Sequence, residues 1–128
     1  MMLTANCVTC QTQDDVAMLG FADDEFNTTQ YVMLQKGLKP SQQDREQGFD
    51  QPHIEVNSQI HSGYCGVVEA QLQENRLVLK LDPQAAADMS VDDTIEIAFH
   101  VPTERLKEMG DQLRLLLGPQ RVHTTLDE

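Results

Sequence analysis

The chain has 128 residues, a length that suits one domain spanning residues 1–128 with a modest hydrophobic core. Its 9 Lys and Arg stand against 21 Asp and Glu, which gives a formal net charge of -12 at pH 7. This charge disfavours nucleic acid as a ligand, because a phosphate backbone is bound through Lys and Arg. It is compatible with a basic protein partner, but an acidic surface that only maintains solubility explains the charge more simply.

Two further features predict the compartment. The longest apolar runs, such as residues 16–19 and 115–117, are far shorter than the roughly 20 residues of a membrane span. The N-terminus lacks the basic start and the longer apolar stretch of a secretory signal. We therefore expect a cytoplasmic protein with no membrane partner, and a homodimer stays open.

In the N-terminal half, hydrophobic periodicity predicts three strands. An edge strand around residues 3–11 is followed by a second strand at Val16–Ala22. After an acidic loop, residues 31–36 are apolar enough for a strand that is buried on both faces. Residues 39–51 contain almost no core material, so we expect a surface loop there, with one helical turn from Ser41.

The middle of the chain predicts a strand and then a hairpin. Residues 54–58 alternate with the period of a half-buried strand, and the glycine-containing segment 61–66 ends it. The hairpin strands are expected at 68–72 and 77–81. On the inward face of the hairpin we expect Val68, Ala70 and Leu72 opposite Leu77, Leu79 and Leu81.

Two helices are predicted in the C-terminal half. Asp82 can cap the first, a short helix with Pro83 in its first position. A strand at residues 94–101 precedes the second helix, which Thr103 is expected to cap. Apolar residues at spacings of three and four predict the face that packs on the sheet: Leu106, Met109, Leu113, Leu116 and Leu117. Gly-Pro then ends this helix, and residues 118–128 are expected to fray.

These elements predict an α+β fold in a single domain. Its mainly antiparallel sheet would have five to seven strands, packed against the C-terminal helix and the short second helix. No internal repeat or low-complexity tract divides the chain.

Cys7 and Cys10 have the C-x-x-C spacing that can bind zinc or cycle as a dithiol. Structural zinc needs four ligands, and neither a second such pair nor a suitably spaced histidine pair follows. β-Branched Val8 and Thr9 favour a strand here over the helix start that a thioredoxin-like site would need. We expect free structural thiols at Cys7, Cys10 and Cys65, with no metal and no cofactor.

The sequence does not assemble a catalytic site, so we expect a binding protein and not an enzyme. Hydrolytic or transfer chemistry needs a nucleophile, a base and oxyanion donors in one cleft. Glu96 and His100 share a strand face but lie about 13 Å apart at roughly 3.3 Å per residue, too far for a dyad.

Two segments are candidates for contacting a partner. Asp23, Asp24 and Glu25 form an acidic loop without the calcium-loop pattern, so the loop is either partner-facing or simply solvated. His61 and Tyr64 lie in a glycine-flanked segment, where tyrosine could anchor an interface. The alternative is that Tyr64 closes the end of the sheet core.

Five segments occur in an order and spacing that resemble the immunity protein 10 family. They are FADDEF from Phe21, the run YVMLQKGL, the turn SGYCG, the link LDPQAAADMSVDD and the strand TIEIAFHV before the final helix. The resemblance covers residues 16–117, and residues 3–13 with the cysteine pair fall outside it. Cys65 stands where the family would be expected to have glycine, in a Gly-Tyr-Gly-Gly turn.

Proteins of this family lie beside toxin genes in bacterial polymorphic toxin systems and are expected to neutralise the cognate toxin by direct binding. The resemblance therefore implies an antidote that covers the toxin's active site or a surface near it. Acidic loops would complement a basic toxin such as a nuclease. The alternative, from another class, is a small metal- or thiol-dependent enzyme or sensor that uses Cys7 and Cys10.

Overall fold

The computed structural model describes residues 1–64 and 66–125, and in these it places two five-stranded sheets. The first sheet contains β1 (Met2–Thr4), β9 (Thr94–Ala98), β8 (Arg76–Leu81), β7 (Val67–Leu72) and β10 (Val122–Thr124), in that order. The second contains β2 (Cys7–Gln13), β3 (Val16–Ala22), β4 (Tyr31–Gly37), β5 (His53–Val56) and β6 (Ser58–Tyr64), in that order. The helices are α1 (Gln42–Glu46), α2 (Pro83–Met89) and α3 (Thr103–Leu117), followed by a 3-10 turn at Pro119–Arg121.

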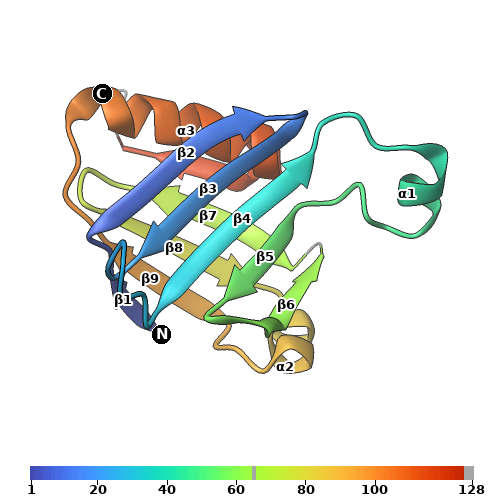
Figure 1. Cartoon of the computed structure of the whole chain (residues 1–128), viewed down its shortest axis with the longest axis horizontal. Coiled ribbons are helices and arrows are strands. Elements are labelled where there is room, and N and C mark those ends of the chain that lie inside the picture. The colour runs from blue at the N-terminus through green and yellow to red at the C-terminus, as the bar shows by residue number, and fades with distance from the viewer. Residues whose placement is uncertain (65, 126–128) are drawn as a thin grey trace.

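The two sheets face each other, and their strands run in crossing directions (Figure 1). The core fills the space between them with side chains that are at most 1% exposed, including Leu19, Phe21, Leu34, Ile54, Leu79, Ile95 and Ile97. Phe21 of the second sheet stacks on Phe99, which follows β9, with ring centroids 6.0 Å apart. Alternation in each strand therefore leaves one face of each sheet for the core and one for the surroundings.

The predicted fold class is confirmed as α+β in a single domain with a C-terminal helix and a shorter helix. The strands are divided between two sheets where the sequence led us to expect one. Neighbouring strands are antiparallel, except that β1 pairs with β9 and β10 pairs with β7 in parallel. None of the described helices has the length and apolarity that crossing a membrane requires.

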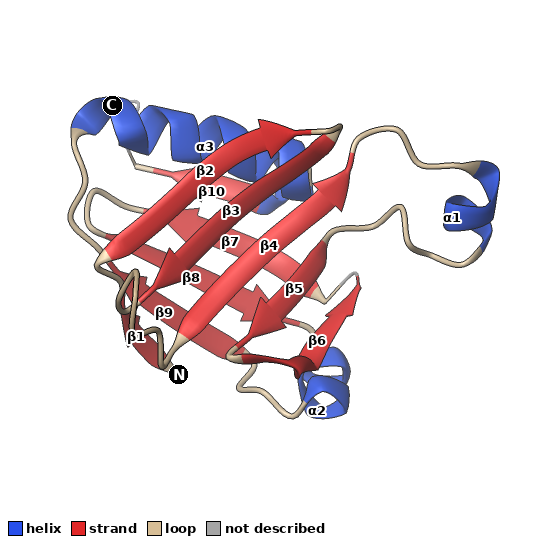
Figure 2. Ribbon diagram, viewed as in Figure 1, coloured by secondary structure: helices blue, strands red, loops and turns tan. Residues whose placement is uncertain are grey.

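Helix α3 lies along one side of the two sheets, and α2 lies at the other side (Figure 2). The predicted apolar face of α3 is confirmed, because all five of its residues are at most 4% exposed. The predicted Thr103 cap is wrong: Pro102 holds the N-cap position and makes no side-chain capping bond. The helix ends as predicted at Gly118, whose φ of 91° suits a residue without a Cβ.

The other two helix starts follow the sequence prediction. Ser41 caps α1 by accepting a hydrogen bond from the Asp44 N–H at 3.0 Å, and the Asp44 carboxylate accepts one from the Ser41 N–H. Asp82 caps α2 by accepting from the Ala85 N–H at 3.0 Å, with Pro83 in the first turn.

Several strands differ from the prediction. The expected strand at 3–11 is split, because β1 joins the first sheet and β2 the second. Strand β4 is buried on one face only. Strand β6 runs through the segment where a break was expected, because it pairs with β5 as far as Tyr64. Residues 122–124, where the end of the chain was expected to fray, form β10.

The hairpin β7–β8 contains a bulge between Val67 and Glu69. The extra residue shifts the alternation, so Val67 is buried and Val68 is 51% exposed. The expectation that Val68 shares the inward face with Ala70 and Leu72 is therefore wrong. Strand β9 also ends at Ala98, three residues before the predicted end.

Candidate partner-binding surface

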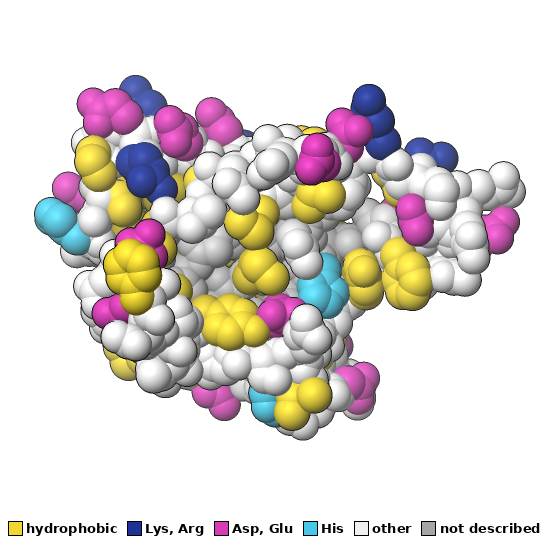
Figure 3. All heavy atoms as spheres, in the orientation of Figure 1, with side chains coloured by type: hydrophobic (Ala, Val, Ile, Leu, Met, Phe, Trp, Pro, Cys, Tyr) yellow, Lys and Arg dark blue, Asp and Glu magenta, His cyan; other side chains and the backbone are white. Residues whose placement is uncertain are grey.

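The face of the second sheet that points away from the core is open, and we call it the outer face. Strand register places Met18, Gly20 and Ala22 of β3 beside Gln35, Met33 and Tyr31 of β4, and places Met33 opposite Glu55 of β5. Thr28, from the loop between β3 and β4, helps to line a hollow of about 230 Å³ on this face. Figure 3 looks onto the outer face and shows hydrophobic side chains gathered in a hollowed floor.

Glu55 lies on the floor of the outer face and is 9% exposed. The Tyr31 hydroxyl donates a hydrogen bond to its Oε2 at 2.6 Å. This hydrogen bond, together with burial and the charge of Glu55, raises the pKa of Tyr31 to about 12. In the part of the chain that the structure describes, no cationic side chain forms an ion pair with Glu55.

Tyr64 lies at one end of the outer face within a small aromatic cluster. It is paired with His53 across β5 and β6, and the two ring centroids lie 4.8 Å apart. Phe49, from the loop that follows α1, lies 5.0 Å from the Tyr64 ring. Both Tyr64 and Phe49 are more than 40% exposed, so the cluster leaves aromatic surface accessible.

His61 belongs to a different surface. Its Nδ1 lies 3.0 Å from the carbonyl oxygen of Met89, at the end of α2. His61 lines a hollow together with Met1, Asn57 and Val91, and Tyr64 is not among the residues that line it. The two predicted contact residues are therefore not brought together.

The acidic loop between β3 and β4 is shaped by its own carboxylates. Asp23 accepts a hydrogen bond from the Thr29 hydroxyl and others from the N–H groups of Thr29 and Gln30. These bonds lower the pKa of Asp23, and the bond from the Thr29 hydroxyl has the largest effect. Asp24 accepts hydrogen bonds from the N–H groups of Asn27 and Phe26. These two bonds, with that from Asn27 having the larger effect, lower the pKa of Asp24. Both carboxylates thus fix the loop conformation.

Glu25 and Phe26 are exposed in the same loop, and Phe26 at 86% exposure is the most exposed of the large hydrophobic side chains in the described residues. The loop joins the Ala22 and Tyr31 ends of β3 and β4, so it lies at the opposite end of the outer face from Tyr64. Phe26 was not singled out from the sequence. The sequence feature that could have identified it is a lone aromatic residue within the polar run that follows β3.

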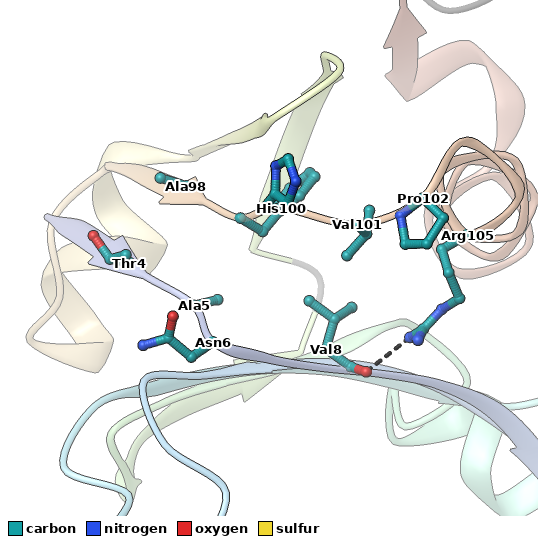
Figure 4. A pocket seen from close by; sticks show the side chains of 10 residues that line it. Thr4, Ala5, Asn6, Val8, Ala98, His100, Val101, Pro102 and Arg105 are labelled. Atoms are coloured by element: carbon teal, nitrogen blue, oxygen red, sulfur yellow. Dashed lines mark hydrogen bonds between the residues drawn. The ribbon is translucent and has the colours of Figure 1, made fainter.

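A cavity of about 450 Å³ lies where β1 and β2 approach the segment between β9 and α3 (Figure 4). Arg105 reaches from α3 to donate a hydrogen bond to the Val8 carbonyl at 2.8 Å, and the Asn6 amide donates to the Asp23 carbonyl at 2.9 Å. His100 also lines the cavity, with its ring pointing away from Arg105 (Figure 4). The lining offers no nucleophile paired with a base, so it does not favour catalysis.

The C-x-x-C pair does not form a joint site. Cys7 and Cys10 are free thiols on β2, three residues apart, and so lie on opposite faces. The Cys10 thiol donates to the Glu108 carbonyl at 3.8 Å, and burial, with the nearby Glu108 charge, raises its pKa. Cys65 lies outside the described residues. Within the described residues, no group of three or more His, Cys, Asp or Glu is placed to hold a metal ion.

Comparison with known proteins agrees with the resemblance seen in the five sequence segments. Residues 4–107 match the family model described as Immunity protein 10. The match begins before β2, so the segment that was expected to lie outside the resemblance is largely within it, and it ends in the first turns of α3. A search of curated proteins finds no match.

Proposed function

The chain belongs to the immunity protein 10 family and is thus an immunity protein against a toxin, and we propose that it neutralises this toxin by direct binding. The observation that carries the proposal is the family match over residues 4–107. The separation of Cys7 from Cys10 and the open outer face also favour binding over thiol or metal chemistry.

The cognate toxin, in this proposal, is a basic protein such as a nuclease. A nuclease must bind a phosphate backbone through Lys and Arg, so the surface that an antidote would cover is itself basic. The net charge of -12 suits such a partner, because complementary charge speeds the encounter and rejects acidic competitors.

The outer face is the contact surface in this proposal. The loop of Asp23, Asp24 and Glu25 supplies negative charge at one end, and Tyr64 supplies an aromatic anchor at the other. His61 is not included, because it contacts α2. We place the complex in the cytoplasm, where a producing cell would need protection from its own toxin.

The proposal is tested with the toxin encoded by the neighbouring gene. Cells that express the toxin should survive when they also express this protein, and the purified proteins should form a complex. Inhibition should be complete at a ratio of one to one or at another fixed stoichiometry. An enzyme that inactivates the toxin would act at far lower ratios, and failure both to bind and to protect would refute the assignment.

A further inference from the structure

We infer that the outer face of the second sheet receives the toxin through one central ion pair, in which Glu55 accepts an arginine or lysine side chain of the toxin. This inference rests on the proposed function and identifies the side chain that would pair with the toxin. Its basis is a carboxylate that is only 9% exposed and that lies between Met33 and Ser62 on the outer face.

Glu55 differs from the other acidic residues of the chain in its surroundings. Only 9% of the residue is exposed, whereas Asp24 and Glu25 of the loop are exposed and Asp23 is partly exposed. The Tyr31 hydroxyl donates to Oε2, and no described cation pairs with the carboxylate. A carboxylate can accept up to about four hydrogen bonds, so Glu55 keeps acceptor capacity for an incoming donor.

A toxin that covers the outer face would remove the remaining water from Glu55. Burying an unpaired carboxylate is costly, whereas a guanidinium or ammonium group offsets this cost by forming charge-assisted hydrogen bonds. Glu55 therefore selects for a partner that places a cation over the floor and selects against one that does not. A metal ion fits less well, because Glu55 is not within a group of metal-binding side chains among the described residues.

The rim of the outer face has the composition of an interface. Phe26 is 86% exposed, Phe49 47% and Tyr64 44%, and these are the exposed large aromatic side chains of the described chain. Phe26 lies in the loop at one end, and Phe49 and Tyr64 are in contact at the other. Aromatic side chains around a central charge exclude water from it, which strengthens an ion pair across the interface.

The experiment measures binding of Glu55→Gln to a catalytically inactive form of the toxin by surface plasmon resonance. Glutamine keeps the shape of the side chain and an oxygen that can accept from Tyr31, but it removes the charge. We expect dissociation to become roughly tenfold faster or more, with a smaller change in association, as is typical when a desolvated charge pair is lost. The matched control is Glu74→Gln, which removes one exposed charge from the hairpin turn of the other sheet.

A second variant leaves Glu55 unchanged and supplies its carboxylate with a cation from the protein itself. Met33 is paired with Glu55 across β4 and β5, so Met33→Arg places a cation beside the carboxylate. It should preserve the fold and weaken toxin binding by at least about tenfold. Met2→Arg, at a 74% exposed position of the first sheet, makes the same change in charge and should bind as wild type.

The outcomes distinguish failure of the central ion pair from failure of the proposed antidote function. If wild-type protein binds and both Glu55→Gln and Met33→Arg dissociate within twofold of it, the central ion pair is refuted and the antidote function stands. If wild-type protein does not bind, the proposed function and the ion pair both fail. Equal losses for Glu74→Gln and Glu55→Gln would mean that overall charge, and not Glu55, determines binding.

Discussion

The Gln112 side chain of α3 donates a hydrogen bond to the backbone carbonyl of Gln11 at 2.8 Å, across 101 residues of sequence. The same amide nitrogen lies 3.1 Å from the Met18 carbonyl on β3. Strand β2 is an edge of the second sheet, with backbone groups that need partners. The helix therefore covers this edge and fixes its own position against the sheet through one polar side chain that is 8% exposed.

Gln112→Met should destabilise the domain, because methionine has a similar volume but no donor for these buried carbonyls. We expect a loss of about 1–3 kcal/mol in the free energy of unfolding, measured by urea denaturation. Gln43→Met, at an exposed position of α1, is the control and should change stability little. A Gln112 variant as stable as wild type would show that water replaces the bonds to β2 and β3.

Leu113→Asp should unfold the protein. Leu113 is 0% exposed, so the aspartate would bury a charge without a partner and cost several kcal/mol, on the order of the whole stability of a small domain. Leu115→Asp, two residues along the same helix at a 45% exposed position, is the matched control. Thermal melting should show a folded Leu115 variant and no cooperative transition for Leu113→Asp; similar melting of both would contradict the assigned helix face.

Acid should loosen the loop of residues 23–30 through Asp23. The folded pKa of Asp23 is lowered from its ordinary value of 3.8, so its contribution is present above the unfolded pKa and is lost as pH falls through the folded pKa. NMR titration should give a pKa below 3.8, with the Thr29 and Gln30 amide signals shifting over the same range. Asp23→Asn should abolish this transition, and Glu25→Gln should leave it unchanged.

Charge reversal in the acidic loop should slow toxin association. If the loop faces a basic toxin, replacing Asp23, Asp24 and Glu25 by lysine turns attraction into repulsion during the encounter, an effect that salt screens. Because Asp23 and Asp24 also shape the loop, Glu25→Lys alone is the cleaner variant, and circular dichroism should confirm that it folds. Association kinetics at low and high salt measure the effect, and unchanged rates would remove this loop from the interface.

Tyr64→Ala should mainly speed toxin dissociation. Removing the ring deletes an exposed aromatic surface and its contacts with His53 and Phe49, while the net charge stays the same. A buried anchor of this kind is worth about 2 kcal/mol or more when truncated. Tyr64→Phe keeps the ring and should bind nearly as wild type. If Tyr64→Ala dissociates at the wild-type rate, this end of the outer face lies outside the interface.

The sequence by itself determined several helix ends, the buried face of α3 and the family. Residues within a few positions of each other decide whether Asp82 and Pro83 can start a helix, whether a helical turn can begin at Ser41 and whether Gly118 ends a helix, and all three predictions are confirmed. The spacing of leucines identified the buried face of α3 for the same reason. The order of five segments identified the family without any three-dimensional information.

Only the tertiary structure decided which strands pair and which residues share a surface. Periodicity tells which residues lie on one face of a strand, but pairing depends on contacts between distant segments, such as β1 with β9 and β10 with β7. The division into two sheets, the bulge beside Val68 and the course of β6 past Gly63 follow from such contacts. The outer face is also a product of pairing: the Tyr31 hydroxyl meets Glu55 only because β4 and β5 lie side by side, and no local pattern could have placed that carboxylate there.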